Sequence, residues 1–207
     1  HRDLHSFPTR RSSDLFGLEY AALSAGEGGR RMLELQREYV RRVVTAVNDL
    51  DNVLFEIANE AGAGSKAWQY DMIGYVKAVE STLPKKHPVG MTFAYKGGTN
   101  AELNASEADW VSPNPGSEKE NYRENPCAGC SPKVVLTDTD HLWGHTGGDA
   151  IWVWKSFTRG LNPLLMEDLT PSPVWQDSAR VAMGQVVRYG RRVQLAAMRP
   201  AAGLAAT

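Results

Sequence analysis

Apolar residues recur at helical spacing in several segments of the chain. Over residues 28–49 an apolar side chain returns every three or four positions, with Arg and Glu between, which is the pattern of an amphipathic helix. The same spacing predicts helices over 66–82 and 174–195. A shorter helix is predicted over 150–159, and a helical turn over 100–108.

Short apolar runs lie between these helices and predict strands. Their sequence is continuously apolar rather than alternating, which is typical of strands buried on both faces. Strands that alternate with helices predict a parallel sheet with right-handed crossovers, and therefore an α/β fold. A doubly wound sheet shares this pattern, but no glycine-rich phosphate-binding fingerprint follows any strand. The predicted strands are 53–58, 89–94, 109–112, 134–138 and 161–166.

Composition narrows the class of partner. A length of 207 residues with 42% hydrophobic and 23% charged residues is typical of a globular protein of one domain. The net charge of −1 argues against nucleic acid as the main partner. No apolar run reaches the roughly 18–20 residues that span a bilayer, so no membrane partner is expected. Two cysteines do not make a disulfide framework.

The two ends of the chain look unlike the rest. Residues 1–15 lack a starting Met and any apolar period, and they resemble a translation of sequencing-adapter DNA, so we leave them out of the fold. A basic, disordered arm is the alternative; a targeting peptide is not expected, because no apolar segment follows the arginines. Residues 201–207 read as a truncated tail. We therefore expect an internal fragment of a longer protein.

An amide and a carboxylate, Asn59 and Glu60, close the first predicted strand and precede a glycine-rich turn. The carboxyl ends of parallel strands are where α/β barrels keep their chemistry. A carboxylic acid shielded there by apolar neighbours can have its pKa raised enough to act as a general acid. The alternative is a solvent-facing loop glutamate after an ordinary core strand.

The run from Phe55 to Glu60 resembles the end of the fourth strand in the large clan of (β/α)8 glycoside hydrolases. This resemblance implies that Glu60 is the acid/base and that Asn59 holds the sugar hydroxyl next to the scissile bond. It also implies that Glu56, which has period-2 phase with Glu60, is a buried partner of an arginine. Residues 16–200 would then be strands four to eight of a TIM barrel, and strands one to three would lie upstream, since a full barrel takes about 250 residues.

A second carboxylate follows the fourth predicted strand. The run from Val134 to His141 occupies the place of the clan's seventh strand, which ends in the catalytic nucleophile. Asp138 aligns best with that residue, and Asp140, on the same strand face, is the alternative. The clan has Glu, so the shorter Asp leaves open a retaining mechanism, with carboxyl groups about 5–5.5 Å apart, or an inverting one, at ~6.5–9.5 Å. Both aspartates could also be turn or N-cap residues.

Longer runs, 108–113, 137–144 and 153–163, resemble a bacterial subgroup of this clan. In that subgroup a β-sandwich module, described as collagen-binding, follows the barrel. The resemblance implies an oligo- or polysaccharide substrate, no cofactor, and such a β-sandwich downstream in the parent protein. The parent is expected to be secreted or periplasmic. We expect the fragment alone to be inactive and poorly soluble, because five strands leave two open sheet edges.

Other side chains near the strand ends are candidates for substrate binding. His141 could donate to a sugar or to the strand-seven carboxylate, and Trp143 could stack on a pyranose. Glu167, with Asp168, closes the last predicted strand and could bind a sugar hydroxyl. The plainer alternatives are a structural histidine and a solvated loop pair. Three other tryptophans are expected to be core or packing residues: Trp110, Trp152 and Trp154.

Two further functions stay open. Cys127 and Cys130 precede His141 and His145, an order that resembles a zinc finger, although an apolar strand intervenes and no basic helix follows. A barrel that binds carbohydrate without cleaving it is the other alternative, since Asp138 stands where the clan has Glu. The cysteines lie in a long polar segment, 113–132, and connections of that length are usually functional or disordered.

Overall fold

The fold is mixed α/β, with parallel strands in the order β1-β2-β3-β4-β5 and helices in three of the four connections between them. The predicted α/β class is therefore confirmed, whereas membership of a (β/α)8 barrel stays a prediction. The chain divides into two compact units, one up to Trp110 and one from Val111, and each is described by itself. The structure is a computed structural model and describes residues 20–23, 26–95, 97–116, 120–143, 147–166 and 174–201.

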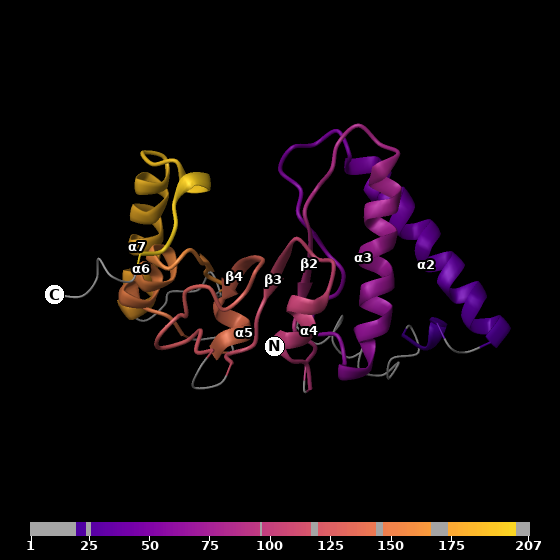
Figure 1. The fold of residues 1–207 in the computed structure, drawn as a ribbon, viewed down its shortest axis with the longest axis horizontal. Helices are drawn as coiled ribbons and strands as arrows, with labels where there is room; N and C mark the ends of the chain where they lie inside the picture. The colour runs from indigo at the N-terminus through magenta and orange to yellow at the C-terminus, as the bar shows by residue number, and fades with distance from the viewer. Residues whose placement is uncertain are drawn as a thin grey trace, which may run out of the picture. The chain divides into compact units, whose positions relative to one another are not determined.

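The first unit packs two long helices beside a short parallel sheet. Helices α2 and α3 lie side by side (Figure 1). The strands β1 and β2 are parallel, with Phe55 opposite Val89 and Glu56 opposite Gly90. The elements are η1 (Tyr20–Leu23), α2 (Gly26–Val47), β1 (Phe55–Glu56), η2 (Ala63–Ser65), α3 (Lys66–Ser81), β2 (Val89–Thr92), α4 (Asn100–Ala105) and β3 (Trp110–Ser112), whose last two residues belong to the second unit.

The core of this unit forms where one face of α3 meets β2. Met72, Ile73 and Val76 are buried on α3 at helical spacing, and Val89 and Met91 are buried on β2. All residues of β2 and β3 are buried, as the apolar runs predict. Continuous burial on both faces is the expected state of a parallel strand.

Strand β1 differs from its prediction. Only Phe55 and Glu56 form the strand, and Leu54 is 58% exposed, so the expectation of a strand buried on both faces is wrong here. In β2, by contrast, packing is tight. A Cβ added at Gly90 would lie 1.9 Å from the indole ring of Trp110, so only glycine fits beneath that side chain.

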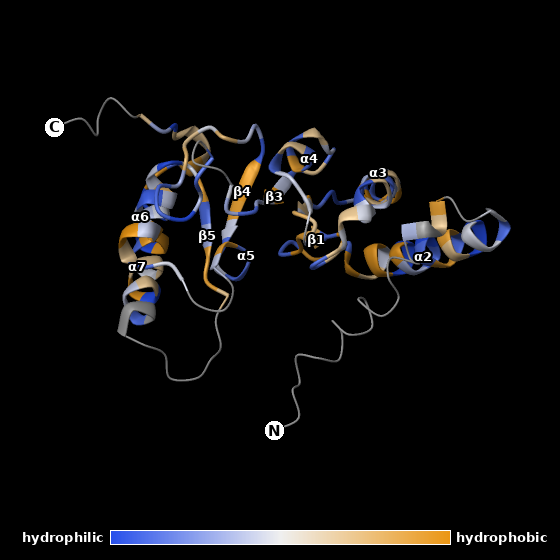
Figure 2. Cartoon of the chain, turned by 90° about the horizontal axis from the view of Figure 1, so that it is seen from below, coloured by the Kyte–Doolittle hydropathy of each residue, from blue (hydrophilic) through white to orange (hydrophobic). Residues whose placement is uncertain are grey.

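The second unit contains β4, β5 and a helical layer. Strands β4 and β5 are parallel, with Asp138 opposite Leu164, and Figure 2 shows the apolar character of β4. Helix α6 packs on α7, and Trp152 and Val153 of α6 are buried. The elements are β4 (Val134–Asp138), α5 (Thr139–Trp143), α6 (Ala150–Thr158), β5 (Asn162–Leu164), α7 (Val174–Gly190) and η3 (Leu195–Ala197).

The connection from β3 to β4 runs along α6, and its described residues, 113–116 and 120–133, contain no helix. Three side chains, two on α6 and one at its carboxyl end, donate hydrogen bonds to every second backbone carbonyl over residues 122–126 of this connection. Trp152 Nε1 donates to Tyr122 O at 3.1 Å, Lys155 Nζ to Glu124 O at 3.1 Å and Arg159 Nη1 to Pro126 O at 2.6 Å. We call residues 120–133 the crossover.

Burial within the crossover centres on Tyr122, which is 2% exposed. Burial raises the pKa of its phenol to about 12, so the hydroxyl stays protonated. A disulfide between Cys127 and Cys130 closes the turn that leads into β4. None of the helices in the described part of the chain is both long and apolar enough to cross a membrane.

Candidate active site at the carboxyl ends of the strands

The segment after β1 carries one residue more than the strand it pairs with. Glu56 lies opposite Gly90, and pairing resumes where Gly62 lies opposite Tyr95. Six positions separate the two residues on the first segment (62 − 56), and five separate their partners (95 − 90). Tyr95 N donates to Ala61 O at 2.8 Å and secures the second pairing. We call the unpaired residues 57–61, which carry this extra position, the bulge; extra residues opposite a shorter strand segment are common at barrel rims and next to active sites.

Glu60 sits on this bulge in a left-handed backbone conformation. Its φ is 48°, and no other non-glycine residue in the described ranges has a positive φ. This conformation costs roughly 1–2 kcal/mol for a residue with a Cβ. Strain of this kind concentrates at functional sites, because the surrounding structure must hold it. Glu60 and Asn59 are exposed, so the apolar shielding expected around Glu60 is not provided.

Glu56 has a different role from the one expected. It is exposed, and its Oε1 accepts a hydrogen bond from Thr92 Oγ1 at 2.5 Å. The prediction of a buried partner for arginine is therefore wrong. The bulge also interrupts the period-2 relation, so Glu56 and Glu60 do not share a strand face by simple alternation.

Tyr20 fastens the backbone next to the bulge. Gly62 N donates to the Tyr20 hydroxyl at 3.1 Å, and the Tyr20 ring packs on Trp68 with centroids 5.4 Å apart. Trp68 Nε1 in turn donates to Gln36 Oε1 on α2 at 3.0 Å. The Glu60 segment is thus tied to both long helices. No sequence pattern predicts this contact, because 42 positions separate Tyr20 from Gly62.

Asp138 is the last residue of β4, and its two carboxylate oxygens contact different groups. The residue is 8% exposed. Its Oδ1 accepts from Asp140 N at 2.8 Å, which caps the start of α5, as the N-cap alternative predicts. Its Oδ2 lies 3.5 Å from His141 Nδ1. Burial raises the pKa of the Asp138 carboxyl, and the charge of His141 and the N–H of Asp140 oppose that shift.

His141 lies between the ends of β3 and β4. Its Nδ1 is 3.0 Å from Ser112 Oγ as well as 3.5 Å from Asp138 Oδ2. The prediction that His141 could serve the strand-seven carboxylate therefore has a geometric basis. A nucleophilic Ser–His–Asp relay uses both ring nitrogens, whereas both partners here face the same nitrogen, so the cluster is not such a relay. Ser112 was not among the sequence candidates.

Trp143 ends α5 and packs within the second unit. The half-buried indole meets Trp152 edge-on, with centroids 5.0 Å apart and an interplanar angle of 84°. A Cβ added at Gly147 would lie 2.1 Å from its ring, so backbone covers part of the indole. Its role as a stacking platform stays a prediction. The packing roles of Trp110, Trp152 and Trp154 are confirmed, since the first two are buried and Trp154 contacts Phe157 and Tyr189.

The structure corrects the zinc alternative. Cys127 and Cys130 form a disulfide, so their sulfurs are not available as metal ligands. No group of three or more potential ligand side chains is present among the residues that the structure describes. Residues 1–15, His145, Glu167 and Asp168, and the tail beyond Ala201, lie outside the described residues. Glu60 and Asp138 belong to different units, so the distance between them stays a prediction.

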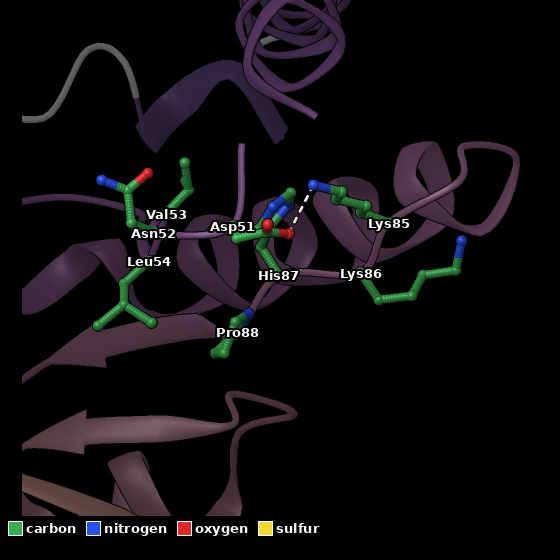
Figure 3. A pocket seen from close by; sticks show the side chains of 8 residues that line it. All are labelled: Asp51, Asn52, Val53, Leu54, Lys85, Lys86, His87 and Pro88. Atoms are coloured by element: carbon green, nitrogen blue, oxygen red, sulfur yellow. Dashed lines mark hydrogen bonds and ion pairs between the residues drawn. The ribbon is translucent and has the colours of Figure 1, made fainter. Parts of the chain in front are cut away.

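An open pocket lies at the opposite, amino-terminal ends of β1 and β2 (Figure 3). It has a volume of about 600 Å³ and is lined by residues 51–54 and 85–88. Its cationic side chains already have partners: Lys85 Nζ lies 2.5 Å from Asp51 Oδ1, and Lys86 Nζ lies 2.5 Å from Leu83 O. In parallel α/β folds, ligands bind at the carboxyl ends of the strands rather than at this end. The candidate active site is therefore at the carboxyl ends.

Comparison with protein families, with curated proteins and with solved structures finds no match to this chain.

Proposed function

We propose that this chain is part of a glycoside hydrolase that cleaves O-glycosidic bonds with two carboxylates. The observation that carries the proposal is that an acidic residue follows each of two parallel strands at its carboxyl end, Glu60 after β1 and Asp138 at the end of β4. Both are held by local structure, the first by a bulge and the second by a helix cap. Parallel α/β enzymes place their reacting groups at these strand ends.

Each carboxyl group has a separate task in this proposal. Glu60 protonates the oxygen of the leaving sugar, and Asn59 holds the neighbouring hydroxyl. Asp138 acts as the nucleophile of a retaining enzyme or as the base that activates water in an inverting one, with Asp140 as the alternative. The positive charge of a protonated His141 favours the ionised form of Asp138, which either role requires. Trp143 and Glu167 complete the sugar-binding set.

The test is hydrolysis of a panel of aryl glycosides and polysaccharides by this chain and by the longer protein expected to contain it. Glu60→Gln removes the transferable proton and is expected to lower kcat/KM on natural substrates by roughly 10²–10⁴-fold. Glu107→Gln, at an exposed position of the same unit, is the matched control and should retain activity. Undiminished turnover by Glu60→Gln would refute the acid/base assignment.

A carbohydrate-binding protein without catalysis is the second candidate. The hydrogen bond from Asp140 N to Asp138 favours it, because this carboxylate already has a structural task. Isothermal titration against the same polysaccharides separates the two functions. Binding that Asp138→Asn leaves unchanged, with no hydrolysis by the unmodified protein, would favour the binding protein.

A further inference from the structure

We propose that Ser112 is a positioning residue, whose hydroxyl fixes the His141 ring beside Asp138 and so keeps that carboxyl group ionised. The inference adds a residue to the proposed active site, and its catalytic consequence rests on the proposed function. Its structural part, the proton position on His141, can be tested without any substrate.

Ser112 is well placed for this task. It is the last residue of β3 and is 3% exposed, so a buried strand fixes its Oγ. His141 lies on the short helix that starts after Asp138, and its side chain is only 10% exposed. The Oγ to Nδ1 distance of 3.0 Å is that of a hydrogen bond. Side chains on strands hold a site more firmly than side chains on loops.

The chemistry of the two neighbours selects one protonation of Nδ1. A serine hydroxyl can donate or accept, whereas an ionised carboxylate can only accept. If Nδ1 lacks a proton, Ser112 donates to it, but the bare nitrogen lone pair then faces Asp138 Oδ2 at 3.5 Å. If Nδ1 carries the proton, Ser112 Oγ accepts it and Asp138 is attracted to it. The second arrangement satisfies both neighbours, so we assign the proton to Nδ1.

Other charged groups near Ser112, His141 and Asp138 also affect the ionisation of the Asp138 carboxyl group. Asp140, in the first turn of α5, raises the pKa of Asp138 and so opposes the ionised form. From the crossover, the Arg123 side chain donates to Leu142 O and brings a positive charge to the end of α5. The Arg123 contact is with a backbone carbonyl, and the Asp140 N–H binds Asp138 Oδ1, whereas Ser112 Oγ lies against Nδ1 itself.

Nitrogen-15 NMR of the 207-residue chain tests the proton position. The ring shifts of His141 are recorded against pH in the unmodified chain, in Ser112→Ala and in Ser112→Thr. We expect the neutral ring to carry its proton on Nδ1 in the unmodified chain. Ser112→Ala removes the hydrogen bond at Nδ1, so a larger fraction of the neutral His141 rings should carry the proton on Nε2. Ser112→Thr keeps the hydroxyl and should restore the unmodified behaviour.

The outcomes separate the alternatives. His87, in the other unit, is the internal control, and its titration should be the same in all three proteins. A neutral His141 ring that carries its proton on Nε2 in the unmodified chain would overturn the proposal, even if Ser112→Ala fails to fold. Equal proportions of the two neutral His141 tautomers in the Ala variant and the unmodified chain would also overturn it.

The catalytic consequence has its own readout. In an active longer protein, Ser112→Ala should raise the pKa of Asp138 and move the acidic limb of the kcat/KM profile to higher pH, and Ser112→Thr should reverse the move. An active enzyme whose acidic limb does not move refutes the catalytic part of the inference. Absence of hydrolysis in the unmodified protein would count against the proposed function only. The NMR result would still decide whether Ser112 positions the His141 ring.

Discussion

Glu80 and His87 form a buried ion pair at the amino-terminal ends of the strands in the first unit. Glu80 Oε1 lies 2.5 Å from His87 Nδ1, and their side chains are 2% and 5% exposed. The other ring nitrogen lies 2.7 Å from Leu50 O. A carboxylate and a carbonyl only accept hydrogen bonds, so both ring nitrogens carry protons. These two bonds raise the pKa of His87 above its usual value.

Stability should therefore fall as the pH rises. The pKa of His87 is higher in the folded state than the value of about 6.5 expected for the unfolded chain. Its stabilisation is fully present below pH ~6.5 and is lost as the pH rises through the folded-state pKa. Urea unfolding across this window is expected to show decreasing stability in the unmodified chain. In His87→Gln the slope should be smaller, and an unchanged slope would contradict the assignment.

Removing only one member of this pair should be costly. Glu80→Leu leaves the charged His87 buried without its carboxylate, which is expected to destabilise the first unit by about 3–5 kcal/mol. The double variant Glu80→Leu with His87→Leu should be more stable than Glu80→Leu alone, because no unpaired charge remains. Chemical denaturation measures both, with exposed Glu107→Leu as the control. Additive effects of the two changes would be inconsistent with a coupled pair.

The left-handed backbone at Glu60 is expected to lower the stability of the chain in exchange for the position of the proposed acid. Glu60→Gly removes the Cβ that makes a φ of 48° unfavourable, so the unfolding free energy should rise by about 0.5–1 kcal/mol relative to Glu60→Ala. Both variants lack the proposed acid and should be equally inactive. Urea midpoints compare them directly. A less stable glycine variant would mean that the backbone at this position is not strained.

Two glycines offer an internally controlled test of packing. Gly90→Ala places a methyl group 1.9 Å from the Trp110 ring and is expected to destabilise the chain by about 1–3 kcal/mol. Gly74→Ala, on α3, meets nothing within 4 Å and should stabilise the helix by roughly 0.5–1 kcal/mol. Thermal melting should show a lower midpoint for Gly90→Ala and a higher midpoint for Gly74→Ala than for the unmodified chain. Equal effects would show that Trp110 can move aside.

Helix α2 carries an exposed apolar stripe that should promote association. Met32, Leu35, Tyr39 and Val43 are 48%, 61%, 69% and 38% exposed, respectively, and follow one another at helical spacing. The double variant Leu35→Lys with Tyr39→Lys should increase the monomeric fraction in light scattering without changing helix content. Glu34→Lys, an exposed change on the same helix, controls for added charge. Association that the double variant leaves unchanged would locate the cause elsewhere.

The elements that the sequence predicts well are those whose signal is local. Helices α2 and α3 follow from apolar spacing, and β2 and β4 follow from short apolar runs between turns. The predicted range of β4, 134–138, is the observed one, whereas α2, α3 and β2 each have at least one end that differs from the prediction by one or two residues. Local periodicity decides the type of an element, whereas its limits depend on caps and on neighbouring strands.

The candidate site was predictable only in part, because its geometry is set by distant partners. The shortness of β1 and the position of Glu60 depend on pairing with Gly90 and Tyr95, more than thirty positions further along the chain. The Ser112–His141 contact spans 29 positions and leaves no periodic trace. The Asp138 cap, in contrast, has the local signature of an acidic residue before a helix, and the N-cap alternative anticipated it.

The way α6 holds the crossover has a consequence for how this protein can change in evolution. Trp152, Lys155 and Arg159 bind backbone carbonyls at residues 122, 124 and 126, and every residue type has a carbonyl. A substitution at the exposed Glu124 therefore leaves these backbone contacts in place, whereas the Asn125 side chain also accepts from Arg159 Nη1, at 2.8 Å. A family of related chains could diversify this surface while keeping the scaffold that carries Ser112 and Asp138. Variation in the crossover should accordingly be tolerated more readily than variation in the α6 residues that hold it.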